Sequence, residues 1–185
     1  MTMNTSLLSD RLWPSSGLAR NAALAVAGSL LVAAAAQVNV PMLPVPMTLQ
    51  SLAVLLIGAA YGARLGAATL ALYALQGALG LPVFAGFTSG FMLASFGYVL
   101  GFIAAAYVVG RLAESGWDRS RLRMFAAMLT GAAVIYVPGL LWLSAWIGAE
   151  QAVQFGLVPF IPGDIVKAAV AALGVPAAWA LLERR

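Results

Sequence analysis

The residues with the clearest potential for chemistry are Asp164 and Lys167, near the start of the last apolar segment. Lys167 is the only lysine in the chain and the only basic residue inside a segment apolar enough to lie in a membrane. A spacing of three residues places both side chains on one face of a helix. Charge in such a place is unfavourable and usually marks function. Two interpretations follow: a structural ion pair that neutralises itself, or a site where the lysine meets a ligand carboxylate and the aspartate accepts ligand N–H groups.

Other kinds of chemistry find little support in the sequence. Cysteine and histidine are both absent, which excludes thiolate chemistry, the usual general base near neutral pH and the commonest metal ligands. The six carboxylates are scattered, and the one lysine is not part of a phosphate-binding G-x-x-x-x-G-K-[ST] loop. The sequence therefore predicts a protein that is not an enzyme and has no cofactor and no metal.

The elements that must position the pair are membrane helices. Hydrophobic residues make up 63% of the chain and charged residues 9%, far from the balance of a soluble domain. The apolar segments lack the strict alternation of barrel strands. We expect an all-α integral membrane protein: a polar leader over 1–17, then one membrane domain over 18–185. Its six spans are predicted at about 18–36, 48–61, 65–79, 91–109, 124–147 and 162–182.

The basic residues predict how these spans are oriented. All nine arginines lie on the leader side of the first span, in the turn at 62–64, in the loop at 110–123 or at the chain end. With six spans these positions lie on one side, which the positive-inside rule makes cytoplasmic, together with both termini. The +4 net charge thus indicates membrane orientation and not nucleic-acid binding. The opposite connections have no arginine or lysine and hold six of the nine prolines, as expected of a stiff lid over a pocket.

Several polar and aromatic residues are candidates for that pocket. Thr48 and Gln50 open the second span below a proline-rich loop, where they can contact a ligand, although Thr48 is equally suited to capping the helix. Tyr73, Phe84 and Tyr98 can form flat apolar walls, with ordinary packing as the alternative. On the first span, Ala19, Ala23 and Ala27 are spaced i, i+4, i+8, and such a row of small residues lets another helix approach closely. The general abundance of alanine is the alternative explanation.

Four motifs in this order resemble the BioY family, the biotin-specific substrate-binding (S) component of energy-coupling-factor (ECF) transporters. The resemblance covers roughly residues 20–182. The segments are Pro44-Val45-Pro46-Met47-Thr48-Leu49-Gln50, Tyr73 through Gly80-Leu81-Pro82-Val83-Phe84-Ala85-Gly86, Gly97-Tyr98-x-x-Gly101-Phe102 and Pro162-Gly163-Asp164-x-x-Lys167. The chain departs from the family's usual Gly-Pro-Thr-Gly-Gly-Tyr stretch between Gly90 and Tyr98, so no ligand contact is carried over from that loop.

The resemblance implies a six-helix S component in the bacterial cytoplasmic membrane that captures biotin from the outer face. It implies that Asp164 and Lys167 belong to the binding region with Gly163, and that the segments around Thr48, Gln50, Phe84 and Gly86 form pocket and lid. It also implies partners: a transmembrane T component docking on the alanine row, and ATPase subunits. Two alternatives stay open, a self-sufficient carrier coupled to protons through Asp164 and Lys167, and a structural subunit without ligand.

Overall fold

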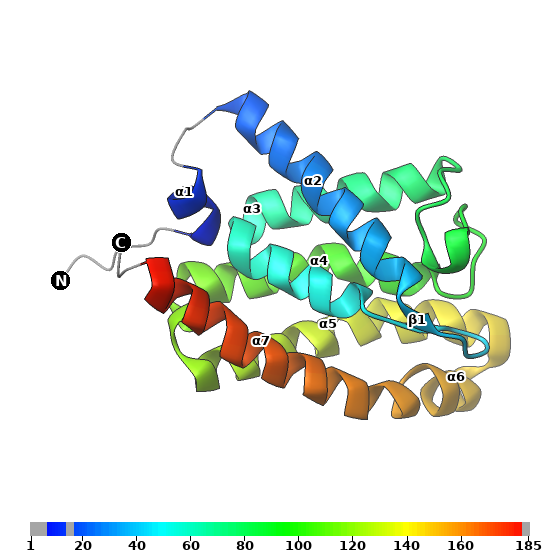
Figure 1. The fold of residues 1–185 in the computed structure, drawn as a ribbon. Coiled ribbons are helices and arrows are strands. Elements are labelled where there is room, and N and C mark those ends of the chain that lie inside the picture. Colours follow the sequence, from blue (N-terminus) through cyan, green and yellow to red (C-terminus); the bar gives the residue numbers. More distant parts are fainter. Residues whose placement is uncertain (1–6, 14–16, 183–185) are drawn as a thin grey trace.

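The computed structural model describes residues 7–13 and 17–182, which form a bundle of helices (Figure 1). The predicted leader residues 1–6 and 14–16 and the charged chain end at 183–185 lie outside the described residues. The elements, in order, are α1 (Leu8–Leu12), α2 (Leu18–Gln37), β1 (Asn39–Val40), β2 (Met47–Thr48), α3 (Gln50–Ala78), η1 (Ala85–Phe87), α4 (Phe96–Glu114), η2 (Trp117–Arg119), α5 (Arg121–Ile147), α6 (Ala149–Gly156), η3 (Val158–Phe160) and α7 (Ile161–Leu182).

Helices dominate because an apolar chain in lipid must satisfy its backbone hydrogen bonds within each segment. Five helical runs in the described part of the chain are long and apolar enough to cross a membrane. They are Leu18–Gln37, Gln50–Ala78, Phe96–Glu114, Arg121–Ile147 and Ala149–Leu182. The sequence prediction of a helical, multi-pass membrane protein is therefore confirmed at this level.

α3 counts as one of these runs, but its chain reverses direction inside the element. Gly62 has φ 80° and ψ 178°, a conformation that interrupts the helix and favours glycine. A Cβ placed on Gly66 would lie 3.1 Å from the Cα of Gly58, although the two residues would be about 12 Å apart in a straight helix. Figure 1 shows the two arms of α3 meeting at this turn. The predicted turn at 62–64 therefore exists as a break within α3.

Other boundaries differ from those predicted. α4 begins at Phe96, where the sequence predicts a span from residue 91, because residues 90–95 form turns, starting with Gly90 at φ 93°. α4 then continues to Glu114, so the charged connection predicted at 110–123 is shorter. The predicted loop at 148–161 contains the helix α6, which follows α5 directly after Gly148. Ala152 of α6 is buried, at 1% exposure.

The most extensive helix contact joins α3 and α4. A Cβ on Gly58 would lie 2.7 Å from the carbonyl oxygen of Ala106, and one on Gly110 would lie 2.3 Å from the backbone nitrogen of Ala63. Glycine at both points lets the backbones approach closely, as small residues do in membrane helix interfaces. α4 thus becomes the central helix, with α5 on its other side (Figure 1).

The two ends of the bundle differ in charge. The seven arginines among the described residues lie in α1, the first turn of α2, the turn after Gly62 and the last turns of α4 through the start of α5. Figure 1 shows these places together at its left, beside the end of α7. The opposite end carries the β1–β2 ribbon, η1 and α6. Among described residues, its only charged side chains are Glu150, Asp164 and Lys167.

Candidate ligand-binding site

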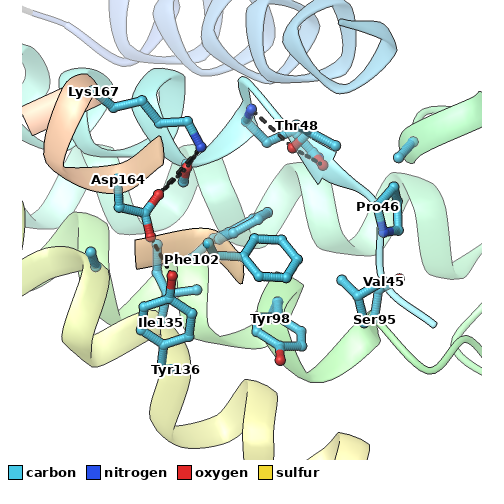
Figure 2. Close-up of a pocket in the computed structure, with 15 residues that line it drawn as sticks. Val45, Pro46, Thr48, Ser95, Tyr98, Phe102, Ile135, Tyr136, Asp164 and Lys167 are labelled. Atoms are coloured by element: carbon cyan, nitrogen blue, oxygen red, sulfur yellow. Dashed lines mark hydrogen bonds and ion pairs between the residues drawn. The ribbon is translucent and has the colours of Figure 1, made fainter. Parts of the chain in front are cut away.

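A pocket lies beneath the β1–β2 ribbon at the end of the bundle that lacks arginine (Figure 2). Helices α3, α4, α5 and α7 supply its walls, and the chain leading into β2 and η1 closes its outer side. The lining residues are Val45, Pro46, Thr48, Gln50, Ser51, Ala85, Ser95, Tyr98, Phe102, Ala132, Ile135, Tyr136, Phe160, Asp164 and Lys167. The predicted Asp–Lys pair therefore lies in a cavity, in the first two turns of α7.

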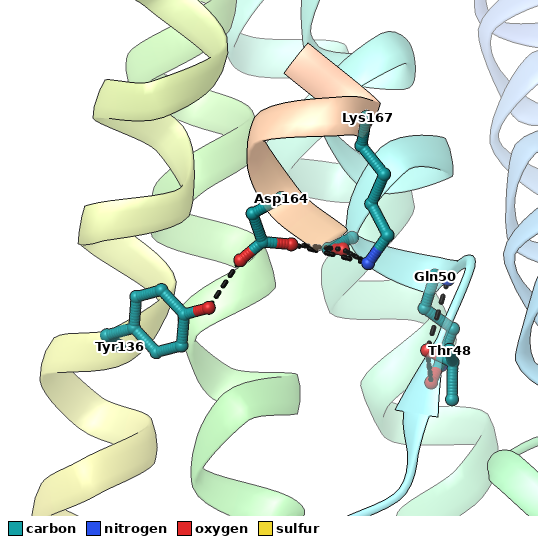
Figure 3. Close-up of polar contacts among 6 residues, drawn as sticks. Thr48, Gln50, Tyr136, Asp164 and Lys167 are labelled. Carbon is teal, nitrogen blue, oxygen red and sulfur yellow. Dashed lines mark hydrogen bonds and ion pairs between the residues drawn. The ribbon is translucent and has the colours of Figure 1, made fainter. Parts of the chain in front are cut away.

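Asp164 is held by three side chains. Its Oδ1 accepts hydrogen bonds from Lys167 Nζ at 3.3 Å and from Ser51 Oγ at 3.4 Å. Its Oδ2 accepts a short hydrogen bond from the hydroxyl of Tyr136 on α5 (Figure 3). Only 12% of the Asp164 side chain is exposed. A carboxylate this secluded depends on its donors, and here they come from three different helices.

Lys167 is the only positive charge in the pocket. Its ammonium donates to Ser51 Oγ at 2.8 Å and to Asp164 Oδ1 at 3.3 Å, and 14% of the side chain is exposed. The ion pair expected from the spacing is thus present, and it faces the pocket. An ammonium group has three N–H donors, so one remains for a ligand oxygen.

Thr48 and Gln50 lie where the sequence predicts them, at the start of α3 beside the pocket. Both line the pocket, and the Thr48 hydroxyl oxygen accepts the backbone N–H of Gln50 at 3.1 Å, satisfying a free donor in the first turn of α3. The Gln50 amide bonds the Thr48 hydroxyl through Oε1, at 3.2 Å, and donates through Nε2 to Tyr73 Oη at 2.5 Å. These bonds fix the amide at the pocket wall.

Four of the predicted site residues do not line the pocket. Tyr73 is fully buried and donates to the carbonyl oxygen of Val83 at 2.9 Å, so it supports Gln50 from behind. The Phe84 ring packs edge-on against Tyr73 with 5.5 Å between centroids and belongs to the core. Gly86, at φ 66°, lies on an outer groove between η1 and the β1–β2 ribbon. Gly163 lies beside the Met47 sulfur, which a Cβ there would approach to 3.2 Å.

Tyr98 does line the pocket, with its ring. Its hydroxyl donates to the carbonyl oxygen of Gly156 at 2.8 Å, tying α4 to α6. The ring stands at 87° to that of Tyr136, with 6.4 Å between centroids. Together with Phe102 and Phe160, these rings give the pocket its aromatic lining. Figure 2 shows Tyr136 bonded to Asp164, with Phe102 and Tyr98 beside it.

Sequence reasoning missed two residues in direct contact with the ion pair, Ser51 and Tyr136. Ser51 follows Gln50 at the start of the second predicted span, so its position was a usable signal. Tyr136 lies within α5, two residues before Pro138, and nothing in its local sequence distinguishes it from a packing tyrosine. Ser95 also lines the pocket, from the loop where the chain departs from the BioY motif.

The alanine row lies far from the pocket. Ala19, Ala23 and Ala27 are all exposed along one face of α2. α2 packs on both arms of α3, where Gly28 faces Thr69, Tyr61 and Ile57, and most of its surface is uncovered. The row is therefore accessible to another helix.

The arrangement can bind a small molecule with an apolar body and polar ends. Asp164 offers a fixed acceptor, Lys167 a charged donor and Gln50 an oriented amide, while the aromatic rings offer flat apolar contact. The free space measures about 70 Å³.

Comparison with known proteins gives one consistent result. The BioY family matches residues 3–184. The probable biotin transporter BioY of Pyrococcus horikoshii is 38% identical over 146 residues, covering 77% of this chain and 86% of the relative. The biotin transporter BioY of Thermotoga maritima is 37% identical over 147 residues, with the same two coverages.

A solved structure gives the fold. The crystal structure of the S-component for biotin from an ECF-type ABC transporter superposes with a TM-score of 0.75 at 21% identity, covering 92% of this chain and 96% of that one. The match therefore extends over nearly the whole bundle and includes the helices that build the pocket. By its sequence match over residues 3–184 and by its relatives, the chain belongs to the BioY family.

Proposed function

We propose that this protein is the biotin-binding subunit of an ECF-type vitamin uptake transporter. The observation that carries the proposal is the pocket itself: an isolated Asp–Lys pair set against aromatic rings, in a chain of the BioY family. Biotin has an apolar bicycle, a ureido group with two N–H donors and one oxygen, and a carboxylate. Each of these has a matching group in the pocket.

The ureido N–H groups are assigned to Asp164, whose carboxylate is already held in a fixed orientation. The bicycle lies against the rings of Tyr98, Phe102 and Phe160. Lys167 pairs with Asp164 and directs its remaining N–H to a ligand oxygen. Thr48 and Gln50 supply the polar edge below the β1–β2 ribbon, and the ribbon and η1 act as the lid.

We further propose six membrane spans with both termini in the cytoplasm. The reversal at Gly62 supports counting α3 as two spans, since its arms run in opposite directions. The clustering of arginine at one end supports a cytoplasmic location for that end. The pocket then opens outward, where biotin is captured, in the cytoplasmic membrane of a bacterium.

Binding to the purified protein tests the function. Asp164→Asn and Lys167→Ala are each expected to weaken biotin binding by about 2 kcal/mol or more, roughly thirtyfold in Kd, because each leaves its partner charge without compensation. Glu150→Gln is the matched control: it removes the other charge of this end outside the pocket and is expected to bind normally. Absence of biotin binding by the unmutated protein would overturn the function, and normal binding by both variants would overturn the site.

The ligand oxygen that Lys167 meets is identified by comparing biotin with its methyl ester. If Lys167 contacts the carboxylate, the ester and the Lys167→Ala variant lose the same interaction, so combining them costs no more than either change alone. If the two losses of binding free energy add up instead, Lys167 contacts the ureido oxygen of biotin or only Asp164.

We propose that transport requires a membrane T component and ATPase subunits, with the T component docking on Ala19, Ala23 and Ala27. Ala23→Leu is expected to retain biotin binding and to lose co-purification with a co-expressed T component, because a larger side chain keeps the helices apart. Ala22→Leu, exposed on the same helix outside the row, is the control. Uptake by proteoliposomes that contain this chain alone and carry a pH gradient would instead favour a self-sufficient, proton-coupled carrier.

A further inference from the structure

A second cavity lies at the opposite, arginine-bearing end of the molecule. It is a groove of about 610 Å³ between α1, the first turn of α2, the turn region of α3 and the last turns of α4. The lining residues are mostly polar and include Arg20, Arg64, Arg111, Tyr61 and Tyr107. None of them contributes to the pocket beneath the β1–β2 ribbon. The biotin site therefore leaves this groove without a role.

Arg20 is the residue of the groove whose hydrogen bonding indicates a binding site. Its side chain is 9% exposed and donates to Asp10 Oδ1 from Nη2 at 3.0 Å. Its Nε is buried and has no hydrogen-bond partner within residues 7–13 and 17–182. Buried N–H donors of folded proteins almost always have an acceptor. The groove thus presents a guanidinium whose donors the described chain satisfies only in part.

The remaining groups of the groove also favour an anion. Arg111 pairs with Glu114 at 3.1 Å, and Glu114 also accepts the backbone N–H of Ala63 at 2.8 Å. Arg64 is exposed and forms no ion pair with any residue that the structure describes. Three arginines therefore face two carboxylates, which leaves one positive charge. Arginine forks and hydroxyl groups are the donors that bind phosphate oxygens most readily.

The surroundings of the groove indicate where the phosphate comes from. Leu12, Trp13 and Leu18 are close in sequence to groove residues, and they are 71%, 46% and 87% exposed. Large apolar side chains beside a basic groove, at the end of membrane helices, are suited to contact with acyl chains and the membrane interface. Soluble phosphate has no apolar part that could contact these side chains. α1 lies against α3 at this end, beside the first turns of α2 (Figure 1).

We propose that the groove binds the phosphate headgroup of an anionic phospholipid, with Arg20 and Arg64 as its principal donors. The headgroup phosphate accepts from the Arg20 guanidinium and from Arg64, while the acyl chains lie along the exposed side chains of α1 and the start of α2. Such basic pockets between membrane helices recognise lipid headgroups by charge and hydrogen bonding. The site is independent of biotin binding, since about 30 Å of α2 separates the two ends.

Native mass spectrometry of the purified full-length protein with phosphatidylglycerol or phosphatidylcholine tests the proposal. The unmutated protein is expected to retain phosphatidylglycerol preferentially. Arg64→Ala and Arg20→Gln are each expected to lower that preference by about fivefold, the effect of one basic residue at an anionic membrane surface. Arg123→Ala removes an exposed arginine of the same end that does not line the groove, and it is expected to change nothing.

Biotin binding by each variant shows that its fold is intact, and Arg64→Ala alone suffices if Arg20→Gln does not fold. Equal lipid retention by Arg64→Ala, Arg123→Ala and the unmutated protein would overturn the site, because the bound lipid would then be non-specific. Competition with inorganic phosphate distinguishes a lipid headgroup from free phosphate as the ligand. Displacement of phosphatidylglycerol only by high concentrations of phosphate supports a lipid site. Tight binding of phosphate without any lipid preference would overturn the assignment to a phospholipid.

Discussion

Asp164 shows how single residues set the chemistry of the pocket, because donors from α3, α5 and α7 converge on one carboxylate. Removing one partner of a secluded ion pair is far more unfavourable than replacing both, since it leaves an uncompensated charge. A structural role for this pair is therefore compatible with the ligand-binding role that we propose for it. The same contacts that hold Asp164 in place also orient its oxygens for a ligand.

Tyr136 tests this positioning role. Tyr136→Phe removes the hydroxyl that bonds Asp164 Oδ2 and leaves the ring, so we expect biotin binding to weaken by about 1–2 kcal/mol, less than for Asp164→Asn. Titration calorimetry measures the change. Tyr107→Phe is the control, because Tyr107 is 47% exposed and lies outside the pocket. Lower thermal stability with unchanged affinity would mean that Tyr136 supports only the fold.

Asp118 is the residue whose titration affects stability. It lies in η2 at 1% exposure, where its Oδ2 accepts a hydrogen bond from Trp179 Nε1 at 2.5 Å, and its Oδ1 has no partner among the residues described. Burial raises the pKa of Asp118, against the opposing effects of the Trp179 hydrogen bond and the Arg119 charge. A raised pKa in the folded state means that the native protein binds the proton more tightly than the unfolded chain does. Its contribution to stability is therefore present at low pH and is lost as pH rises through the folded pKa.

We expect Asp118→Asn to be more stable than the unmutated protein near neutral pH. The amide keeps an acceptor for Trp179 and removes the charge that burial disfavours. The difference in melting temperature in detergent should shrink as pH falls from neutral into the acidic range, because Asp118 takes up its proton as the pH drops through its raised pKa. A difference that does not change with pH would contradict the assignment of the raised pKa to this group.

At the scale of elements, the close contact between α3 and α4 holds together two of the helices that line the pocket. Gly110→Ala introduces a Cβ at 2.3 Å from the Ala63 backbone, so the helices must separate, at an expected cost of about 1–3 kcal/mol in stability. Gly174→Ala in α7 is the matched control, because a Cβ there meets nothing within 4 Å. Thermal unfolding of both variants measures the effect. Equal stability of the two variants would show that the backbones of α3 and α4 are less closely packed at Gly110 than the structure indicates.

At the scale of the whole molecule, the absence of cysteine allows a direct test of orientation. A single cysteine at Leu43, which is 91% exposed in the β1–β2 loop, is expected to react with a membrane-impermeant thiol reagent on intact cells. A single cysteine at Ser115, between α4 and η2, is expected to react only after the cells are opened. The reverse labelling would place the pocket on the cytoplasmic side and would contradict uptake from outside.

Much of this architecture could be predicted from composition and charge. The apolar runs predict the bounds of α2 and α7 to within one residue and those of α5 to within three, because in lipid an apolar segment has little alternative to a helix. The spacing of Asp164 and Lys167 predicts their ion pair, because both lie within one helix and the contact is local. The break at Gly62 is also foreseen, since it depends on glycine and its neighbours in the chain.

Only the tertiary structure decided which residues surround that pair. Ser51 and Tyr136 reach Asp164 from helices that are distant in the sequence, and no local pattern distinguishes them. Tyr73 and Phe84 were expected at the wall but lie behind it, because aromatic residues suit a core and a pocket equally well. The sequence by itself determined that a membrane helix carries an ion pair in its first two turns. The packing of α3, α5 and α7 determined that this pair lines a cavity, because the position of one helix face against another depends on side chains from all of them.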